Sequence, residues 1–95
     1  MPRPAIHPGE ILEEELDFRG INPAEAARAL GVPANRVSQI LSGKRAITAD
    51  TALRLGYWLG TGPEVWINLQ RQYELRIVDS EIGDEIRKTV VPLAS

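Results

Sequence analysis

Polar side chains of the kinds that bind DNA are concentrated between residues 35 and 45. They combine amides, hydroxyls and cations at short spacing: Asn35, Arg36, Ser38, Gln39, Ser42, Lys44 and Arg45. Amide, hydroxyl and guanidinium groups match the donor and acceptor patterns of base edges in the major groove. Adjacent cations can neutralise the phosphates that flank that groove. The stretch therefore predicts a DNA-binding surface, with an ordinary solvated helix face and loop as the alternative.

Two short helices joined by a tight turn are expected to position this surface, within residues 22–43. Asn22 is a good N-cap, Pro23 fits the first helical position, and Glu25 completes a capping-box pattern. Gly31 then provides a C-terminal stop that tolerates positive φ. The polar side chains fall on the outer face of the second helix and in the loop after it.

Small and branched side chains are expected to pack the two helices against each other. Ala26 and Ala27 are small enough to allow a close, steep crossing. The remaining apolar positions at helical spacing would fill the wedge between the helices: Leu30, Val32, Val37 and Ile40. This combination is typical of a helix-turn-helix.

The charge distribution agrees with a nucleic-acid partner although the chain as a whole has a net charge of −2. Residues 21–62 carry five basic and two acidic side chains, a net charge of +3. The flanking segments are acidic, with −3 for residues 1–20 and −2 for residues 63–95. A local basic patch is enough for phosphate binding, so the acidic overall balance does not exclude it.

Further helices are predicted on both sides of the central pair, at residues 10–19, 48–59 and 64–75, with a short one at 79–88. Their expected packing residues are Ile11, Leu12, Leu16 and Phe18 in the first, Leu53, Leu55, Trp58 and Leu59 in the second, Trp66, Leu69 and Tyr73 in the third, and Ile82 and Ile86 in the last. The aromatic face of the third either completes the core or forms a dimer surface, and the sequence does not decide between these two roles. The apolar segment 89–94 contains Pro92, which bars it from a central strand.

Several classes of protein are unlikely matches for this composition. There is no cysteine, and the single histidine, His7, has no partner at ligand spacing, so we expect it to pack or to begin a helix. The sequence contains no Gly-rich phosphate loop, and its acidic residues have no partner base, so nothing in it indicates an enzyme. No apolar run is long enough for a signal peptide or a membrane span. We expect a cytoplasmic protein of one small domain, without cofactor or metal, preceded by an extended arm at residues 1–7.

Four blocks of the sequence resemble the HigA-type antitoxins, also described as plasmid-maintenance antidote proteins, of the Xre-like or lambda-repressor-like helix-turn-helix family. The blocks are HPGEIL at 7–12, ARALGV at 27–32, NRVSQILSGKRAITADTALRL at 35–55 and GTGPEVWINLQRQYEL at 60–75. Together they cover roughly residues 6–78, and their combination is specific to this subfamily.

The resemblance implies an all-α, five-helix DNA-binding domain at residues 1–78, followed by a C-terminal tail at 79–95. It implies a homodimer that binds a palindromic operator at its own promoter and neutralises a RelE-like ribonuclease that cleaves mRNA. Carried over residue by residue, it gives Asn35, Arg36, Ser38 and Gln39 as base or phosphate contacts, and Lys44, Arg45 and Thr48 as backbone contacts.

One stretch departs from the family pattern. Many Xre-like domains begin the first motif helix with a Ser or Thr cap and a Gln that touches phosphate. This chain has Asn22, Pro23, Ala24 and Glu25 there, so the Gln is missing and an acid is added.

Two other functions fit parts of the sequence. A stand-alone Xre-like repressor without a toxin would use the same DNA chemistry, but the blocks at 7–12 and 60–75 favour the antitoxin. A protein-interaction module that has lost DNA binding would suit the acidic flanks. It predicts no salt-dependent affinity for DNA, whereas Arg36, Lys44 and Arg45 lead us to expect one.

Overall fold

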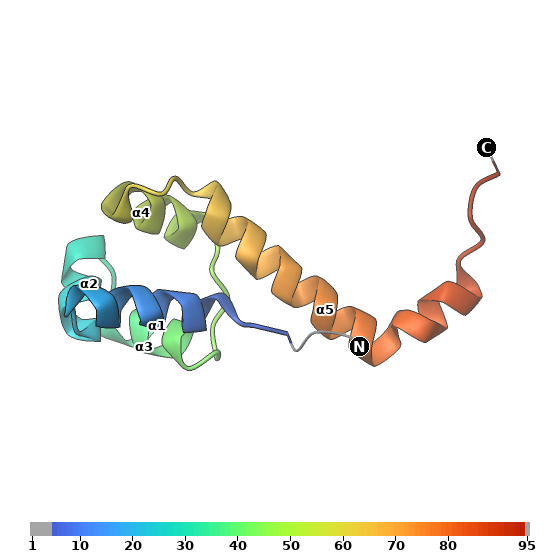
Figure 1. The fold of residues 1–95 in the computed structure, drawn as a ribbon, viewed down its shortest axis with the longest axis horizontal. Coiled ribbons are helices and arrows are strands. Elements are labelled where there is room, and N and C mark those ends of the chain that lie inside the picture. Colours follow the sequence, from blue (N-terminus) through green and yellow to red (C-terminus); the bar gives the residue numbers. More distant parts are fainter. Residues whose placement is uncertain (1–4, 95) are drawn as a thin grey trace.

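Five α-helices form the structure, a computed structural model that describes residues 5–94. They are α1 (Pro8–Arg19), α2 (Pro23–Leu30), α3 (Ala34–Leu41), α4 (Ala49–Leu59) and α5 (Glu64–Thr89). Residues 5–94 contain no strand, which confirms the all-α prediction. Four helices and the first part of α5 make a compact body, from which the rest of α5 projects (Figure 1).

The helix ends follow the local signals in the sequence. At α2, the Asn22 side chain accepts from the Glu25 N–H at 2.8 Å, and the Glu25 carboxylate accepts from the Asn22 N–H at 3.1 Å. Glu25, the acid that this helix start adds to the family pattern, therefore serves as half of a capping box. Gly31 adopts φ 70°, the left-handed conformation that lets the chain turn at once toward α3.

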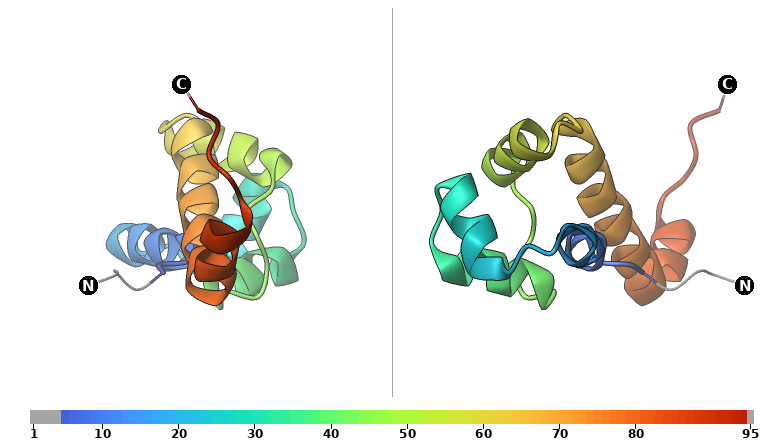
Figure 2. Two further views of the ribbon diagram at one scale, coloured as in Figure 1. Left: turned by 90° about the vertical axis from the view of Figure 1, so that its right-hand side faces the viewer. Right: turned by 60° about the vertical axis from the view of Figure 1, so that its left-hand side comes forward.

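The core lies where the body helices meet, and α1 sits between α3 and α5 (Figure 2). Its fully buried side chains come from every helix and from the loop before α4: Leu12, Leu16, Ala26, Ala27, Leu30, Val37, Ile40, Ile47, Ala52, Leu55 and Trp66. Ala26 and Ala27 are nearly inaccessible, as expected for the close approach of α2 and α3. At Gly9, a β-carbon would overlap the carbonyl oxygen of Ile40, so this glycine allows α1 to touch the backbone of α3.

Four of the expected packing residues are exposed. Ile82 and Ile86 are 46% and 42% exposed on the projecting end of α5, and the other two lie in α1 and α4. Phe18 is 90% exposed and Leu53 is 62% exposed. Each lies two residues from a buried leucine, Leu16 or Leu55, which is about 200° around a helix. Counting apolar residues within a helix overestimated its buried face in both cases.

Trp66 resolves the choice left open for the aromatic face of residues 64–75. It is 2% exposed within the core, and its indole N–H donates to the Thr61 hydroxyl at 3.0 Å. Leu69 packs against the core and Tyr73 is half-buried. This face therefore completes the core of the monomer.

Helix α5 is longer than predicted, because it continues past Leu75 to Thr89 and includes the expected short helix 79–88. No glycine or proline occurs between residues 64 and 82 to end it. Figure 1 shows that α5 bends part-way along. Ser80 donates to the Ile77 carbonyl at 2.9 Å, and Gly83 follows; Ser and Gly are common causes of such bends. Residues 90–94, which include Pro92, are non-helical and exposed.

Of the predicted N-terminal arm, residues 1–4 lie outside the described part, and Ala5 and Ile6 are non-helical. No helix within residues 5–94 combines the length and apolarity needed to cross a membrane.

Candidate nucleic-acid interface

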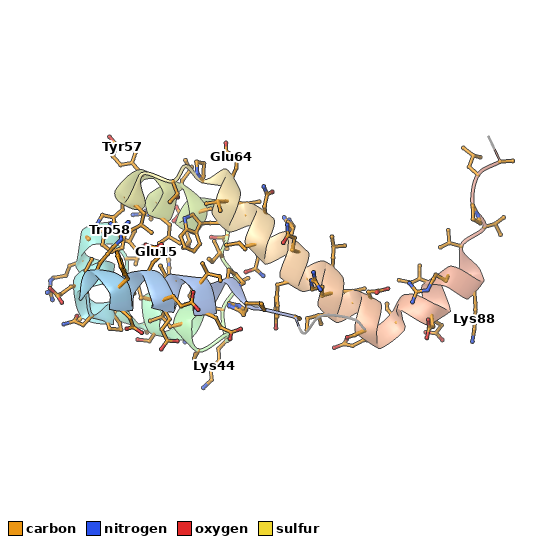
Figure 3. The ribbon with its side chains drawn as sticks, viewed as in Figure 1. Glu15, Lys44, Tyr57, Trp58, Glu64 and Lys88 are labelled. Atoms are coloured by element: carbon orange, nitrogen blue, oxygen red, sulfur yellow. The ribbon has the colours of Figure 1, made fainter. Side chains whose placement is uncertain are left out.

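Helix α3 and the loop that follows it lie at one edge of the body. The inner face of α3 is fixed by Val37 and Ile40, which are each 1% exposed. Its outer face carries the predicted polar residues, and Figure 3 shows Lys44 pointing away from the rest of the molecule. The predicted packing and polar positions of α3 are therefore separated on opposite faces, as a helix that enters a groove requires.

The structure brings all seven predicted site residues to this edge. Five are exposed, namely Asn35, Ser38, Lys44, Arg45 and Thr48, while Arg36 and Gln39 are half-buried. Ser38 turns its hydroxyl back to the Ala34 carbonyl at 3.3 Å, which is an ordinary intrahelical contact. Lys44 and Arg45 make no ion pair with any residue in the range 5–94. Their positive charges are therefore available to an anionic ligand.

Arg36 differs from the two loop cations because it is already paired. Its guanidinium lies 3.5 Å from the Asp50 carboxylate, which also accepts from Arg54 at 2.8 Å. The hydrogen bond from Arg54 is the main cause that lowers the pKa of Asp50, and the charges of Arg54 and Arg36 add to it. Asp50 thus holds Arg36 at the junction of α3 and α4.

Arg54 also joins α4 to the end of α2. Its Nη1 donates to the Leu30 carbonyl at 2.9 Å, one of the carbonyls left without a partner where α2 ends. Sequence reasoning missed both Asp50 and Arg54 as organisers of the site. Their i, i+4 spacing on one helix could have predicted this ion pair from the sequence.

Gln39 and Arg45 form a direct side-chain contact between α3 and the loop that follows it. The Arg45 Nε donates to Gln39 Oε1 at 2.8 Å. The main chain reinforces this contact, since the N–H groups of Lys44 and Arg45 donate to the Gln39 carbonyl at 2.8 and 3.2 Å. A shallow hollow of about 230 Å³ lies beside them, lined by Arg36, Arg45, Ala46, Thr48, Asp50, Thr51 and Arg54.

The loop between α3 and α4 is anchored to the body at Ile47. Its side chain is 2% exposed, and its N–H donates at 2.9 Å to the Oε1 of Gln70, a buried residue of α5. Thr48 then caps α4 by accepting from the Thr51 N–H at 3.3 Å. Gln70 was missed by sequence reasoning, and no local signal could have revealed a contact across 23 residues.

His7 supports the same loop from the other side. Its Nδ1 accepts from the Gly9 N–H at 2.9 Å and caps α1, and its ring meets the Tyr73 ring edge-on at 4.9 Å. Burial is the main cause that lowers the pKa of His7, while a hydrogen bond with the backbone of Arg45 and the charge of Glu10 oppose it. The expected packing and helix-starting role of His7 is confirmed.

These features define a class: a helix-turn-helix protein in which α2 and α3 form the motif and α3 is the recognition helix. A family model described as helix-turn-helix matches residues 12–56. Among curated proteins, the antitoxin HigA-1 of Vibrio cholerae is 38% identical over 92 residues, which covers 96% of this chain and 86% of that protein.

Two solved structures extend the comparison over nearly the whole fold. An addiction module antidote protein of the HigA family from Coxiella burnetii is 48% identical, with a TM-score of 0.94 over 96% of this chain and all of that chain. The Pseudomonas aeruginosa antitoxin HigA, solved with the higBA promoter, is 42% identical, with a TM-score of 0.92 and the same coverage. The chain belongs to the HigA family of antitoxins, within the Xre-like helix-turn-helix proteins.

Proposed function

We propose that this protein is an autorepressing antitoxin that binds operator DNA at its own promoter and neutralises a RelE-like ribonuclease encoded beside it. The single observation that carries the DNA-binding part is the exposed pair Lys44 and Arg45, which makes no ion pair within residues 5–94 and lies beside the polar face of α3. The Pseudomonas aeruginosa relative was solved with promoter DNA, which supports the same role here.

Each predicted site residue has a role in this proposal. Asn35 and Gln39 face the groove and offer amide groups to base edges. Ser38, Lys44, Arg45 and the start of α4 at Thr48 lie beside the flanking phosphates. Arg36 reaches a phosphate once DNA competes with Asp50 for its guanidinium, since an exposed ion pair at 3.5 Å holds it only weakly.

The projecting part of α5 supports the proposal of a homodimer. The part of the helix that projects from the body carries exposed apolar side chains at a helical repeat: Leu75, Val78, Ile82 and Ile86. Burial of such a stripe on an otherwise polar helix is favourable, and a second copy of the chain offers an identical stripe to pack against it. Pairing two copies would present two recognition helices to successive major grooves, about 34 Å apart on a palindromic operator.

The toxin surface is proposed on the acidic face of α1 or on residues 76–95. Glu13, Glu14 and Asp17 are exposed on α1. A ribonuclease that binds RNA carries basic side chains, so acidic surfaces attract it and speed the encounter. We assign the chain itself no catalytic role and place it in the cytoplasm. Within residues 5–94, no three acidic, His or Cys side chains gather to hold a metal.

Fluorescence anisotropy against labelled DNA from just upstream of the gene tests the proposal. We expect tight, site-selective binding that weakens steeply with salt, and weak binding to a scrambled duplex of equal composition. Equal affinity for both duplexes at every salt concentration would overturn the operator assignment. Copurification with the product of the neighbouring gene, followed by an mRNA cleavage assay with and without the antitoxin, tests neutralisation separately.

A further inference from the structure

The hydrogen bond between Arg45 and Gln39 fixes which way the Gln39 amide points. The Nε of a guanidinium only donates, so the atom 2.8 Å from it must be the amide oxygen and not the amide nitrogen. The two main-chain bonds to the Gln39 carbonyl hold the start of the loop against the end of α3, which keeps Arg45 close to the Gln39 amide. A contact within the protein itself therefore favours this amide orientation.

With the amide in this orientation, only some polar groups of Gln39 and Arg45 can bind a base. Within residues 5–94, the NH₂ group of Gln39 has no hydrogen-bond acceptor, and Arg45 makes no ion pair that would occupy its two Nη groups. Because Gln39 is only half-buried, a base can approach its side chain. The pair therefore offers donors, and its only acceptor lies against a cation.

This arrangement alters the usual preference of glutamine. A free glutamine reads adenine with two bonds, accepting from N6–H with its oxygen and donating to N7 with its nitrogen. Beside Arg45, the oxygen already accepts a charged hydrogen bond, and the guanidinium repels the positive end of the adenine N6–H group. Guanine presents two acceptors, O6 and N7, which suit a group of donors.

We propose that Arg45 acts as a positioning residue that makes Gln39 a donor-only reader, so that the Gln39–Arg45 pair selects guanine over adenine at one base pair of the operator. The inference rests on the proposed operator binding and deepens it. Lys44 provides the internal contrast, because it is a neighbouring cation whose side chain makes no hydrogen bond to the Gln39 side chain within residues 5–94.

The test measures binding of wild-type protein to its upstream DNA and to a set of duplexes in which each base pair is replaced in turn. For the wild type, we expect replacement of one G·C pair by A·T to cost roughly 5- to 150-fold in affinity, the range of a specific base contact. Arg45→Ala should reduce this guanine preference to less than about threefold while weakening binding to all duplexes.

A double-mutant cycle separates positioning from simple charge loss. Gln39→Ala should remove the preference at the same base pair, and adding Arg45→Ala to it should change that preference no further. Lys44→Ala is the matched control, which should weaken every duplex equally and leave the guanine preference intact. Thermal melts by circular dichroism establish that each variant is folded before its DNA affinity is compared.

Two results would overturn the inference, and they have different consequences for the proposed operator binding. If the wild type is site-selective but Arg45→Ala keeps its full guanine preference, Arg45 does not orient Gln39, while operator binding stands. If the wild type shows no site-selective binding at all, the proposed function and this inference fail together.

Discussion

Single side chains at the interface divide into those with a partner and those without one. Arg54 is held by Asp50 and by the end of α2, and Arg36 shares the same carboxylate. Lys44 has no such contact, and Figure 3 shows it extended from the loop. A lysine without an ion pair loses none when it binds a phosphate. Substitution of Lys44 therefore tests contact with the DNA backbone most directly.

Replacing this lysine should weaken binding without altering selectivity. We expect Lys44→Ala to reduce affinity for all duplexes by a similar factor and to lower the slope of log affinity against log salt by about one unit. Lys88→Ala, which removes an exposed lysine near the far end of α5, is the control and should leave the slope unchanged. An unaltered slope for Lys44→Ala would remove this residue from the interface.

His7 makes the stability of the fold depend on pH. Burial lowers its pKa in the folded protein below the ordinary value of about 6.5, because desolvation disfavours the charged imidazolium. The unfolded chain therefore binds a proton first, and the contribution of His7 is fully present above pH 6.5. As the pH falls below that value and through the folded-state pKa, this contribution is lost.

Thermal melts between pH 8 and pH 5 measure the effect of His7. We expect the wild-type melting temperature to fall as the pH drops below about 6.5. His7→Asn keeps a side-chain acceptor for the helix start but does not ionise in this range, so its fall should be smaller. Parallel melting curves for the two proteins would show that His7 is not the titrating group.

At the scale of elements, the crossing of α2 and α3 depends on side-chain volume. Ala27 is 2% exposed between the two helices, whereas Ala29 lies on the exposed side of α2. The two positions share one helix and one residue type, and they differ in what a larger side chain would meet.

A leucine at the crossing should therefore destabilise the fold. We expect Ala27→Leu to cost about 1–3 kcal/mol through overpacking, which lowers the melting temperature of a domain of this size by several degrees per kcal/mol. Ala29→Leu is the matched control and should melt close to the wild type. If both variants melt alike, the close contact of the helices does not pass through Ala27.

The whole molecule is elongated, with extents of 51 × 25 × 22 Å, because α5 projects beyond the body. Across the bend, Arg87 binds both Asp79 and Asp84 at 2.8 Å. Positions eight residues apart lie about 12 Å apart along a straight helix, so the bend is what brings Asp79 within reach of Arg87. The end of α5 is therefore a defined arm with an exposed apolar stripe, which suits assembly of two copies.

A charge within this stripe should disrupt the proposed dimer. We expect Ile82→Glu to shift the protein toward monomer in size-exclusion chromatography with light scattering, and to weaken operator binding by removing the second recognition helix. Lys88→Glu places a glutamate at an exposed position about 240° around the helix from Ile82 and should leave the dimer intact. A wild type that is monomeric at all concentrations would rule out the dimer.

The sequence by itself determined where α2 starts and stops and the two faces of α3. Asn22, Glu25 and Gly31 act on neighbours within a few residues, and the 3.6-residue repeat of Val37 and Ile40 identifies an inner face. These features depend on local geometry, so a single sequence reveals them. The resemblance at residues 6–78 pointed to the family that the comparisons then showed.

Only the tertiary structure decided how the loop and the long helix are held. Gln70 meets Ile47 across 23 residues, Arg54 meets Leu30 across 24, and Asp50 binds Arg36 from the next helix. It also showed that Phe18 and Leu53 face solvent and that α5 continues to Thr89. Such contacts depend on where whole helices lie relative to one another, and no local repeat in the chain encodes that placement.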